Sequence, residues 1–204
     1  VIGLVVPALE KLQQRLDRTK KALSATQFNF KPYSSHIMVT CPWGNRIRCH
    51  SPENFNGMNL GIPYIEFDVP DASTKPISDF YSRVFNAPVI ERKTSCCVQI
   101  GTLQTITFKE ARREQKTYDG HHIAIYLADF SGPHAQLKKM GLITEESDAN
   151  QYRFEDICNN RGNPVFQIEH EVRSLHHPLH GRNLVNRNAD QTFFNYRKGY
   201  DFHD

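Results

Sequence analysis

The sequence lacks any apolar run that could cross a membrane. No stretch approaches the roughly 18 to 20 residues that a bilayer-spanning helix needs, and residues 1–7 lack the positive flank and the apolar length of a signal peptide. Basic residues form no stripe, because 25 Lys and Arg against 22 Asp and Glu leave a net charge of only +3. A nucleic-acid binder draws most of its affinity from such a stripe. We therefore expect a globular chain with no transmembrane segment and no nucleic-acid partner.

Cysteines are few and carry no metal-ligand spacing. The five lie at positions 41, 49, 96, 97 and 158, an odd number, and Cys96 and Cys97 would point to opposite faces of a strand. We interpret them as reduced packing residues, which favours the cytoplasm or another reducing compartment. The chain opens on Val1 inside an apolar, strand-like run. We therefore expect further residues upstream, which leaves an organelle open as the location.

What the sequence does contain is a unit of about fifty residues that recurs three times. Each copy reads as a strand, an amphipathic helix and three further strands. The first copy is predicted at Ile2–Pro7, Ala8–Leu23, Phe28–Phe30, Ile37–Thr40 and Arg46–Cys49. The second is predicted at Tyr64–Val69, Pro76–Phe85, Pro88–Glu91, Cys96–Ile100 and Leu103–Lys109. The third is predicted at His122–Leu127, Gly132–Met140, Leu142–Glu145, Tyr152–Ile157 and Val165–Val172.

Three segments carry a resemblance to a known family. Ile65–Ala87 (IEFDVPDASTKPISDFYSRVFNA) and His121–Asp129 (HHIAIYLAD) resemble module openings of the vicinal oxygen chelate superfamily, which includes glyoxalase I, bleomycin-resistance proteins and extradiol dioxygenases. Cys41–Arg48 (CPWGNRIR) resembles its closing "DP.GN.IE" hairpin. The resemblance implies an α+β fold of tandem βαβββ modules, three of them visible, paired into a curved mixed β-sheet cup.

The resemblance also implies a division of the chain. Residues 1–52 would be the second half of an N-terminal domain whose first module is missing, because the "GN" hairpin closes the second module of a domain. Residues 61–172 would be a complete C-terminal domain, and residues 173–204 an aromatic, basic tail. This is the four-module layout of extradiol dioxygenases without its first quarter.

Strand alternation predicts which side chains face the cup. His122 and Tyr126 share one face of the third module's first strand, and Tyr64, Glu66 and Asp68 share one face of the second module's first strand. In the last strand, Gln167, Glu169 and Glu171 share a face. Buried carboxylates need a cation or solvent to balance them.

The family places its metal ligands on the first and last strands of each module. This implies His122 and Glu169 as ligands of a divalent metal, with Glu66 as a third; the alternative is that they are polar pocket walls and that no metal binds. Such a ligand set suits Fe(II) or Mn(II), with Zn(II) also open. The corresponding first-domain positions are Val1 and Arg48, which are not metal ligands.

Two tyrosines are candidates for acid–base or substrate-orienting roles, Tyr64 and Tyr126; the alternative is a core tyrosine with a bonded hydroxyl. The resemblance implies a metal-dependent enzyme that acts on a small substrate with neighbouring oxygens, with extradiol-type ring cleavage as the leading chemistry. The alternative function is a non-catalytic small-molecule binder or an accessory subunit of a larger assembly.

The tail, residues 173–204, holds five aromatics within ten residues: Phe193, Phe194, Tyr196, Tyr200 and Phe202. Such side chains are costly to leave in water, so we expect the tail to dock on a surface. That surface could belong to this chain or to another subunit, which would make the protein a homo-oligomer or part of a larger assembly. His176, His177 and His180 are interpreted as exposed loop residues rather than a metal cluster.

Overall fold

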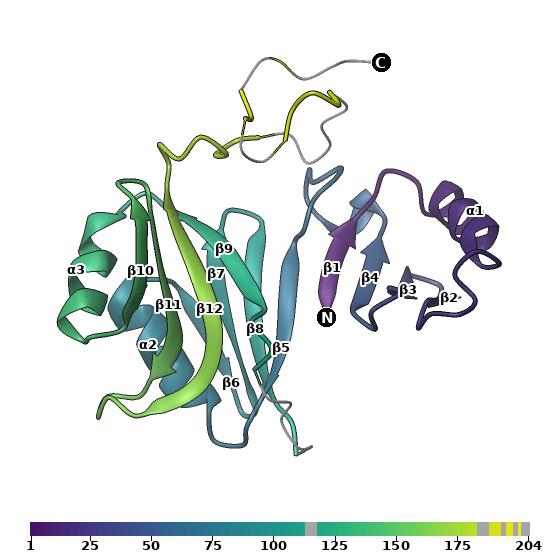
Figure 1. The fold of residues 1–204 in the computed structure, drawn as a ribbon. Coiled ribbons are helices and arrows are strands. Elements are labelled where there is room, and N and C mark those ends of the chain that lie inside the picture. The colour runs from purple at the N-terminus through teal and green to yellow at the C-terminus, as the bar shows by residue number, and fades with distance from the viewer. Residues whose placement is uncertain (113–117, 183–187, 193–194, 198–199, 201–204) are drawn as a thin grey trace. The chain divides into compact units, whose positions relative to one another are not determined.

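The computed structural model describes residues 1–112, 118–182, 188–192, 195–197 and 200 (Figure 1). Contacts within the chain divide it into two compact units. Unit 1 comprises Val1–Thr74 and Pro88–Ala111, and unit 2 comprises Lys75–Ala87 and Arg112–Asp204. Among the described residues, no helix is long and apolar enough to cross a bilayer.

Unit 1 is built on one eight-stranded sheet, called sheet A, with strand order β2-β3-β4-β1-β5-β8-β7-β6. Its strands are β1 (Ile2–Val5), β2 (Asn29–Pro32), β3 (His36–Thr40), β4 (Arg46–His50), β5 (Tyr64–Val69), β6 (Val89–Arg92), β7 (Ser95–Gly101) and β8 (Gln104–Glu110). The first and second repeats meet where β1 and β5 pair antiparallel, at Ile2 and Ile65. A short 3-10 helix, η1 (Pro52–Asn54), precedes β5.

Helix α1 (Leu9–Thr19) packs on one face of sheet A at its β3 and β4 strands (Figure 1). Its leucines at positions 9, 12 and 16 pack on a buried cluster of Ile37, Val39 and Cys49. The helix ends at Thr19, short of the predicted Leu23. The Thr19 hydroxyl donates to the Leu16 carbonyl and competes there with the helical bonds of the backbone. The next amide, of Lys20, bonds the carbonyl of Asp17, three residues earlier, so the regular α-helical pattern stops at this point.

Unit 2 contains a four-stranded sheet, called sheet B, with strand order β10-β11-β12-β9. Its elements are α2 (Thr74–Phe85), β9 (His122–Leu127), α3 (Ser131–Lys139), β10 (Ile143–Asp148), β11 (Gln151–Cys158) and β12 (Pro164–Ser174). Strands β9 and β12 run parallel, and the other two pairs are antiparallel. Most of α2 belongs to this unit, although its sequence lies between β5 and β6.

The helices of unit 2 lie on the apolar face of sheet B. The ring of Phe80 in α2 packs against Phe154 of β11, with 5.9 Å between centroids. In the same helix, Tyr81 hydrogen-bonds His170 of β12, a fully buried histidine. Leu137 of α3 is also fully buried. The opposite face of sheet B is therefore left to the polar side chains of its strands.

The predicted α+β class and the threefold recurrence of strand, helix and three strands are confirmed. The boundaries of the two units differ from those of the predicted domains, 1–52 and 61–172. Strands β1 and β5 pair and so join the first two repeats in one sheet, whereas most of α2, from the second repeat, belongs to unit 2. The assignment of residues 61–172 as a complete domain, with 1–52 as a remnant, stays a prediction.

Candidate functional site

The polar face of sheet B gathers the alternate side chains of β9, β11 and β12. On the parallel strands β9 and β12, His122 lies opposite Glu169 and Tyr126 lies opposite Arg173. Residues opposite each other on adjacent strands point to the same face of a sheet. His122 and Glu169, which were predicted to face the same side, are therefore neighbours on one surface of sheet B.

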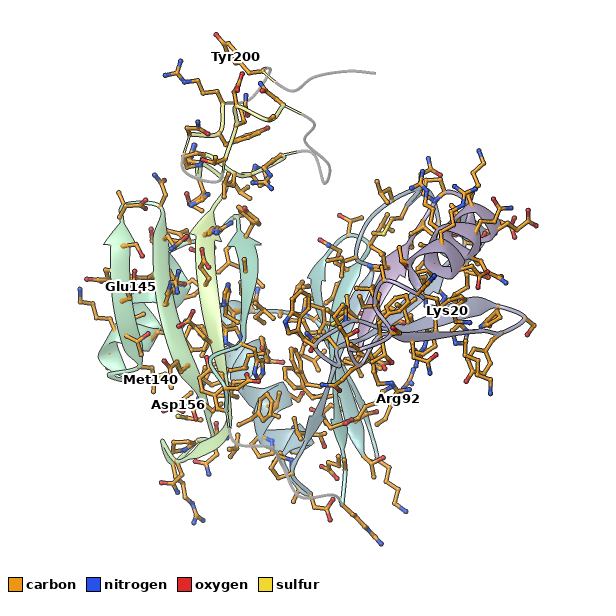
Figure 2. All side chains as sticks on the ribbon, turned by 45° about the vertical axis from the view of Figure 1, so that its right-hand side comes forward. Lys20, Arg92, Met140, Glu145, Asp156 and Tyr200 are labelled. Carbon is orange, nitrogen blue, oxygen red and sulfur yellow. The ribbon has the colours of Figure 1, made fainter. Side chains whose placement is uncertain are left out.

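Both carboxylates of β12 on this face are held by arginine. Arg153 of β11 donates from Nη1 to Glu169 Oε1 at 2.8 Å, and its Nη2 lies 3.5 Å from Glu171 Oε2. Glu145, labelled on β10 in Figure 2, lies 3.6 Å from Arg153 Nε. The side chain of Glu171 is only 5% exposed, so its charge depends on these partners. His122 Nε2 is 3.8 Å from Glu171 Oε2, and half of the His122 side chain is exposed.

Arg173 ties Tyr126 into the same network. Its Nη1 donates to the Tyr126 hydroxyl at 2.9 Å, and its Nε donates to Gln151 at 3.0 Å and to Glu171 at 2.9 Å. Burial lowers the pKa of Arg173, but the hydrogen bonds to Tyr126 and Glu171 outweigh it and hold the pKa above its ordinary value. Tyr126 is thus a tyrosine with a bonded hydroxyl, and its predicted acid–base role stays a prediction.

The first turns of the tail fold back on Tyr126. His177 is buried and lies edge-on to the Tyr126 ring at 6.2 Å, and Leu179 is buried beside it. The Leu179 amide donates to His177 Nδ1 at 3.2 Å. Burial, and then the nearby Arg173, lowers the pKa of His177. The expectation that His177 is exposed is wrong, because the chain turns back here and brings the side chain of His177 against the Tyr126 ring.

Further along the tail, Tyr200 is 62% exposed (Figure 2). The other described aromatic, Tyr196, has the Arg182 guanidinium 5.6 Å from its ring centroid. The other three aromatics of the tail, Phe193, Phe194 and Phe202, lie outside the described residues. Docking of the tail on a surface stays a prediction.

On sheet A, the face opposite α1 carries a second polar cluster, called the Arg48 cluster, which comprises His36, Arg46, Arg48, His50, Tyr64, Glu66 and Lys109. Its centre is the Tyr64 hydroxyl, which accepts a hydrogen bond from Arg48 Nη1 at 2.9 Å and lies 2.8 Å from His50 Nε2.

Tyr64 reaches Arg48 on β4 by lying across β1 at Gly3. A Cβ at Gly3 would come within 2.6 Å of the Tyr64 ring, so this close approach requires glycine. Burial raises the pKa of Tyr64. Burial also lowers the pKa of His50, and the charges of His36 and Arg48 lower it further. The cluster therefore holds a neutral tyrosine and a histidine that favours its neutral form.

Glu66, the predicted third ligand, is already ion-paired within unit 1. Lys109 Nζ lies 2.6 Å from Glu66 Oε1, and Arg48 Nη1 lies 3.8 Å from Glu66 Oε2. The pairing with Arg48 agrees with the donor-only chemistry of a guanidinium at that position. Glu66 belongs to unit 1, whereas His122 and Glu169 belong to unit 2.

The described residues do not fit a metal centre. Each predicted carboxylate ligand has a lysine or arginine within 2.8 Å, and within the described ranges no group of three or more His, Cys, Asp and Glu side chains could hold a metal ion. The ion pairs would have to open before these oxygens could coordinate a cation. The ligand roles of His122, Glu169 and Glu66 stay predictions.

Sequence reasoning identified Arg48 but missed three other residues that organise the two clusters, namely Arg153, Arg173 and His50. Two of them could have been found from the sequence, because side chains two residues apart on a strand point to the same face. Arg173 follows Glu171 by two residues, and His50 follows Arg48 by two. Arg153 shows no such signal, since only the antiparallel pairing of β11 with β12 brings it opposite Glu171.

The chain is similar to several solved structures. A Bacillus subtilis protein assigned as a dioxygenase matches 90% of this chain and 66% of its own length, with a TM-score of 0.55 and 13% identity. A Bacillus cereus protein assigned as a glyoxalase matches 55% of this chain and 97% of its own, with a TM-score of 0.42 and 14% identity. Lactoylglutathione lyase from Agrobacterium tumefaciens matches 56% of this chain and 92% of its own, with a TM-score of 0.39 and 13% identity.

The match to the Bacillus subtilis protein shows that the chain shares its fold, in agreement with the fold that the resemblance to the vicinal oxygen chelate superfamily implied. Neither a family model nor a curated protein matches the sequence. Identities this low show the fold and nothing of the activity, because one fold supports many chemistries.

Proposed function

We propose that the chain is a non-catalytic small-molecule binder with this fold and that it takes a small oxyanion at the Arg48 cluster. The observation that carries the proposal is the hydrogen bond from Arg48 to the Tyr64 hydroxyl. Arg48 lies on the last strand of the first module and Tyr64 on the first strand of the second module. The resemblance described above implies that the family places its metal ligands on these two kinds of strand. A guanidinium has only donors and cannot coordinate a metal, whereas it suits a carboxylate or a phosphate.

Exposure and charge distinguish the Arg48 cluster from the arginine network of unit 2. The side chain of Arg48 is 29% exposed, and its nearest carboxylate, on Glu66, is 3.8 Å away and is held more closely by Lys109. Arg173, by contrast, is 9% exposed and is hydrogen-bonded to its carboxylate. Arg48 therefore retains accessible donor capacity for an incoming anion, and the Tyr64 hydroxyl lies beside it.

The test is a titration of the full chain with inorganic phosphate and with oxalate, followed by calorimetry and by the NMR signal of His50. Binding of an anion beside Arg48 should raise the pKa of His50, since negative charge favours the protonated imidazole. Arg48→Gln should abolish both signals, and Arg92→Gln, on strand β6 of the same sheet, is the matched control. Anion binding that survives Arg48→Gln would overturn the proposal.

A metal-dependent enzyme is the second candidate, and one observation favours it. His122 lies opposite Glu169 in the sheet and 3.8 Å from a Glu171 oxygen. A histidine and two carboxylates thus share one surface, and a metal would have to displace the arginines that pair with both carboxylates. An enzyme of this kind would act on a small substrate with neighbouring oxygens, with extradiol ring cleavage as the leading reaction. Elemental analysis of the purified full-length protein separates the candidates. Stoichiometric Fe, Mn or Zn that is lost in His122→Ala would favour the enzyme.

A further inference from the structure

The Tyr64 hydroxyl lies between two side chains of strand β4 that point to the same face, Arg48 and His50. It accepts a hydrogen bond from Arg48 Nη1 at 2.9 Å and lies 2.8 Å from His50 Nε2. The Tyr64 ring is held from two sides, because it lies across β1 at Gly3 and packs against the Phe55 ring, with 6.4 Å between centroids. The hydroxyl is therefore a fixed bridge between a permanent cation and a group that titrates.

The protonation state of His50 decides the direction of its hydrogen bond with Tyr64. A guanidinium has only donors, so the Tyr64 oxygen accepts from Arg48 in either state. When the imidazole is neutral, Nε2 can accept, and the hydroxyl donates its hydrogen to it. When the imidazole is protonated, both ring nitrogens carry hydrogens, so Nε2 donates and the hydroxyl hydrogen must turn to another acceptor. Among the bonds described for this hydroxyl, His50 is the only acceptor.

The charges around His50 oppose its protonation. Burial lowers the pKa of His50 most, and the charges of His36, whose ring centroid is 5.8 Å away, and of Arg48 lower it further. The titratable and charged groups on the surrounding elements are Lys31 on β2, His36 on β3, Arg46 and Arg48 on β4, Glu53 in η1, and Tyr64 and Glu66 on β5. Glu66 is paired most closely with Lys109. Positive charge therefore dominates near His50 until an anion joins the cluster.

We infer that an anion in the Arg48 cluster is bound together with one proton, which His50 takes up, and that Tyr64 then donates its hydroxyl hydrogen to the anion. This inference rests on the proposed function and assigns His50 as a positioning residue of that site. The anion offsets the positive charge that opposes protonation, and it is the acceptor that the reversed hydroxyl requires. By linkage, the proton favours anion binding as much as the anion favours protonation.

The affinity for an anion should therefore rise as the pH falls. An anion raises the pKa of His50, so binding is strongest below the pKa of the free protein and weakens as the pH rises through the pKa of the complex. An opposite charge within about 4–6 Å raises a pKa by about one or more, and a rise of one corresponds to a tenfold gain in affinity. Sulfate should bind on the order of tenfold more tightly at about pH 5.5 than at about pH 7.5.

Sulfate is the probe, because it stays a dianion over this pH range. Calorimetry on the full chain at constant ionic strength measures its affinity at both pH values. At about pH 6.5, titrations in imidazole and in Bis-Tris, two cationic buffers with different ionisation enthalpies, give the number of protons taken up. We expect at least about half a proton per sulfate at this pH. Equal affinity at both pH values, with no proton uptake, would overturn the inference.

Three histidine variants identify the group that takes up the proton. His50→Gln keeps a polar side chain beside the Tyr64 hydroxyl, and it should bind sulfate equally at both pH values with no proton uptake. His36→Gln removes a neighbouring charge, so the pH profile should move to higher pH and keep its amplitude. His176→Gln, at an exposed histidine of unit 2, is the control and should change neither quantity. A pH dependence that survives in His50→Gln would refute the role of His50.

Two further variants separate the parts of the argument. Tyr64→Phe removes the hydroxyl and should weaken sulfate binding more at about pH 5.5 than at about pH 7.5, since the hydroxyl turns to the anion only when His50 is protonated. Equal weakening at both pH values would contradict the reversal. Sulfate binding that survives Arg48→Gln, or no saturation up to roughly 10 mM at either pH, would refute the proposed function itself. Binding that requires Arg48 but is independent of pH would refute only the proton uptake.

Discussion

Lowering the pH from about 7.5 to about 4.5 should weaken the packing of α2 on sheet B through one buried histidine, His170. Burial lowers the pKa of His170 from 6.5 to about 4. Its Nδ1 lies 2.9 Å from the Ile168 carbonyl, which can only accept, so Nδ1 carries the proton. Its Nε2 then accepts from the Tyr81 hydroxyl at 2.6 Å. The neutral imidazole fits this site, and the imidazolium does not.

The sign and size follow from linkage. Between pH 6.5 and 4 the unfolded chain binds a proton at this position and the folded chain does not, so the free energy of unfolding falls as the pH falls. One pKa unit corresponds to about 1.4 kcal/mol, so the complete effect below pH 4 is ~3 kcal/mol. At pH 4.5, which lies close to the folded-state pKa of His170, most of it is already lost.

The perturbation is His170→Phe, which keeps the stacking on Phe154, now 4.2 Å between ring centroids. At pH 7.5 the variant should be less stable by about 1–3 kcal/mol, because Tyr81 and Ile168 lose a partner. At pH 4.5 it should equal or exceed the parent, since it has no imidazole to protonate. Urea unfolding at both pH values measures the difference, and Tyr81→Phe is the matched variant that keeps the histidine.

Two results would refute this reasoning. One is a stability difference between His170→Phe and the parent that is the same at both pH values. The other is an NMR titration in which His170 protonates near 6.5, as an exposed histidine does. Either would mean that the imidazole is accessible to water and that α2 does not seal it.

Three further outcomes are expected. Gly3→Ala should push the Tyr64 ring off β1, lower the melting temperature and reduce phosphate affinity, as calorimetry would measure; unchanged affinity would show that the tyrosine does not need this path. Arg153→Met should lower the free energy of unfolding by about 2–4 kcal/mol, because it leaves the buried Glu171 with one arginine fewer, and the loss should shrink in Arg153→Met with Glu171→Gln. Deletion of residues 175–204 should lower the melting temperature, since buried side chains of the tail's first turns are lost; an unchanged melting temperature and oligomeric state by light scattering would show a tail without a docking role.

The local pattern predicted the elements well where periodicity was strong. The third module's first strand was expected at His122–Leu127 and has those bounds, because its alternation of apolar and polar residues is complete. The first helix was expected to reach Leu23, since its leucine spacing continues, but it ends at Thr19, whose hydroxyl bonds the Leu16 carbonyl and after which the Lys20 amide bonds Asp17. Alternation also predicted that His122 and Glu169 share a face, which requires only the period of a strand.

The sequence could not predict which side chains on neighbouring strands would contact each other. The two-residue period of a strand predicts which side chains share a face, but not which residue of the adjacent strand lies opposite. Arg153 meets Glu169 only because of the register of β11 on β12, and Tyr64 meets Arg48 only because Gly3 lets the ring cross β1. In the described structure these contacts pair Glu66 and Glu169, the predicted metal ligands, with cationic side chains.

The sequence by itself determined the module, since hydrophobic period, turn residues and repeat order are local and survive without a fold. The tertiary structure alone decided the charge balance of each polar face. That balance depends on distances between residues far apart in the chain, and an electrostatic interaction exists only once those distances are fixed.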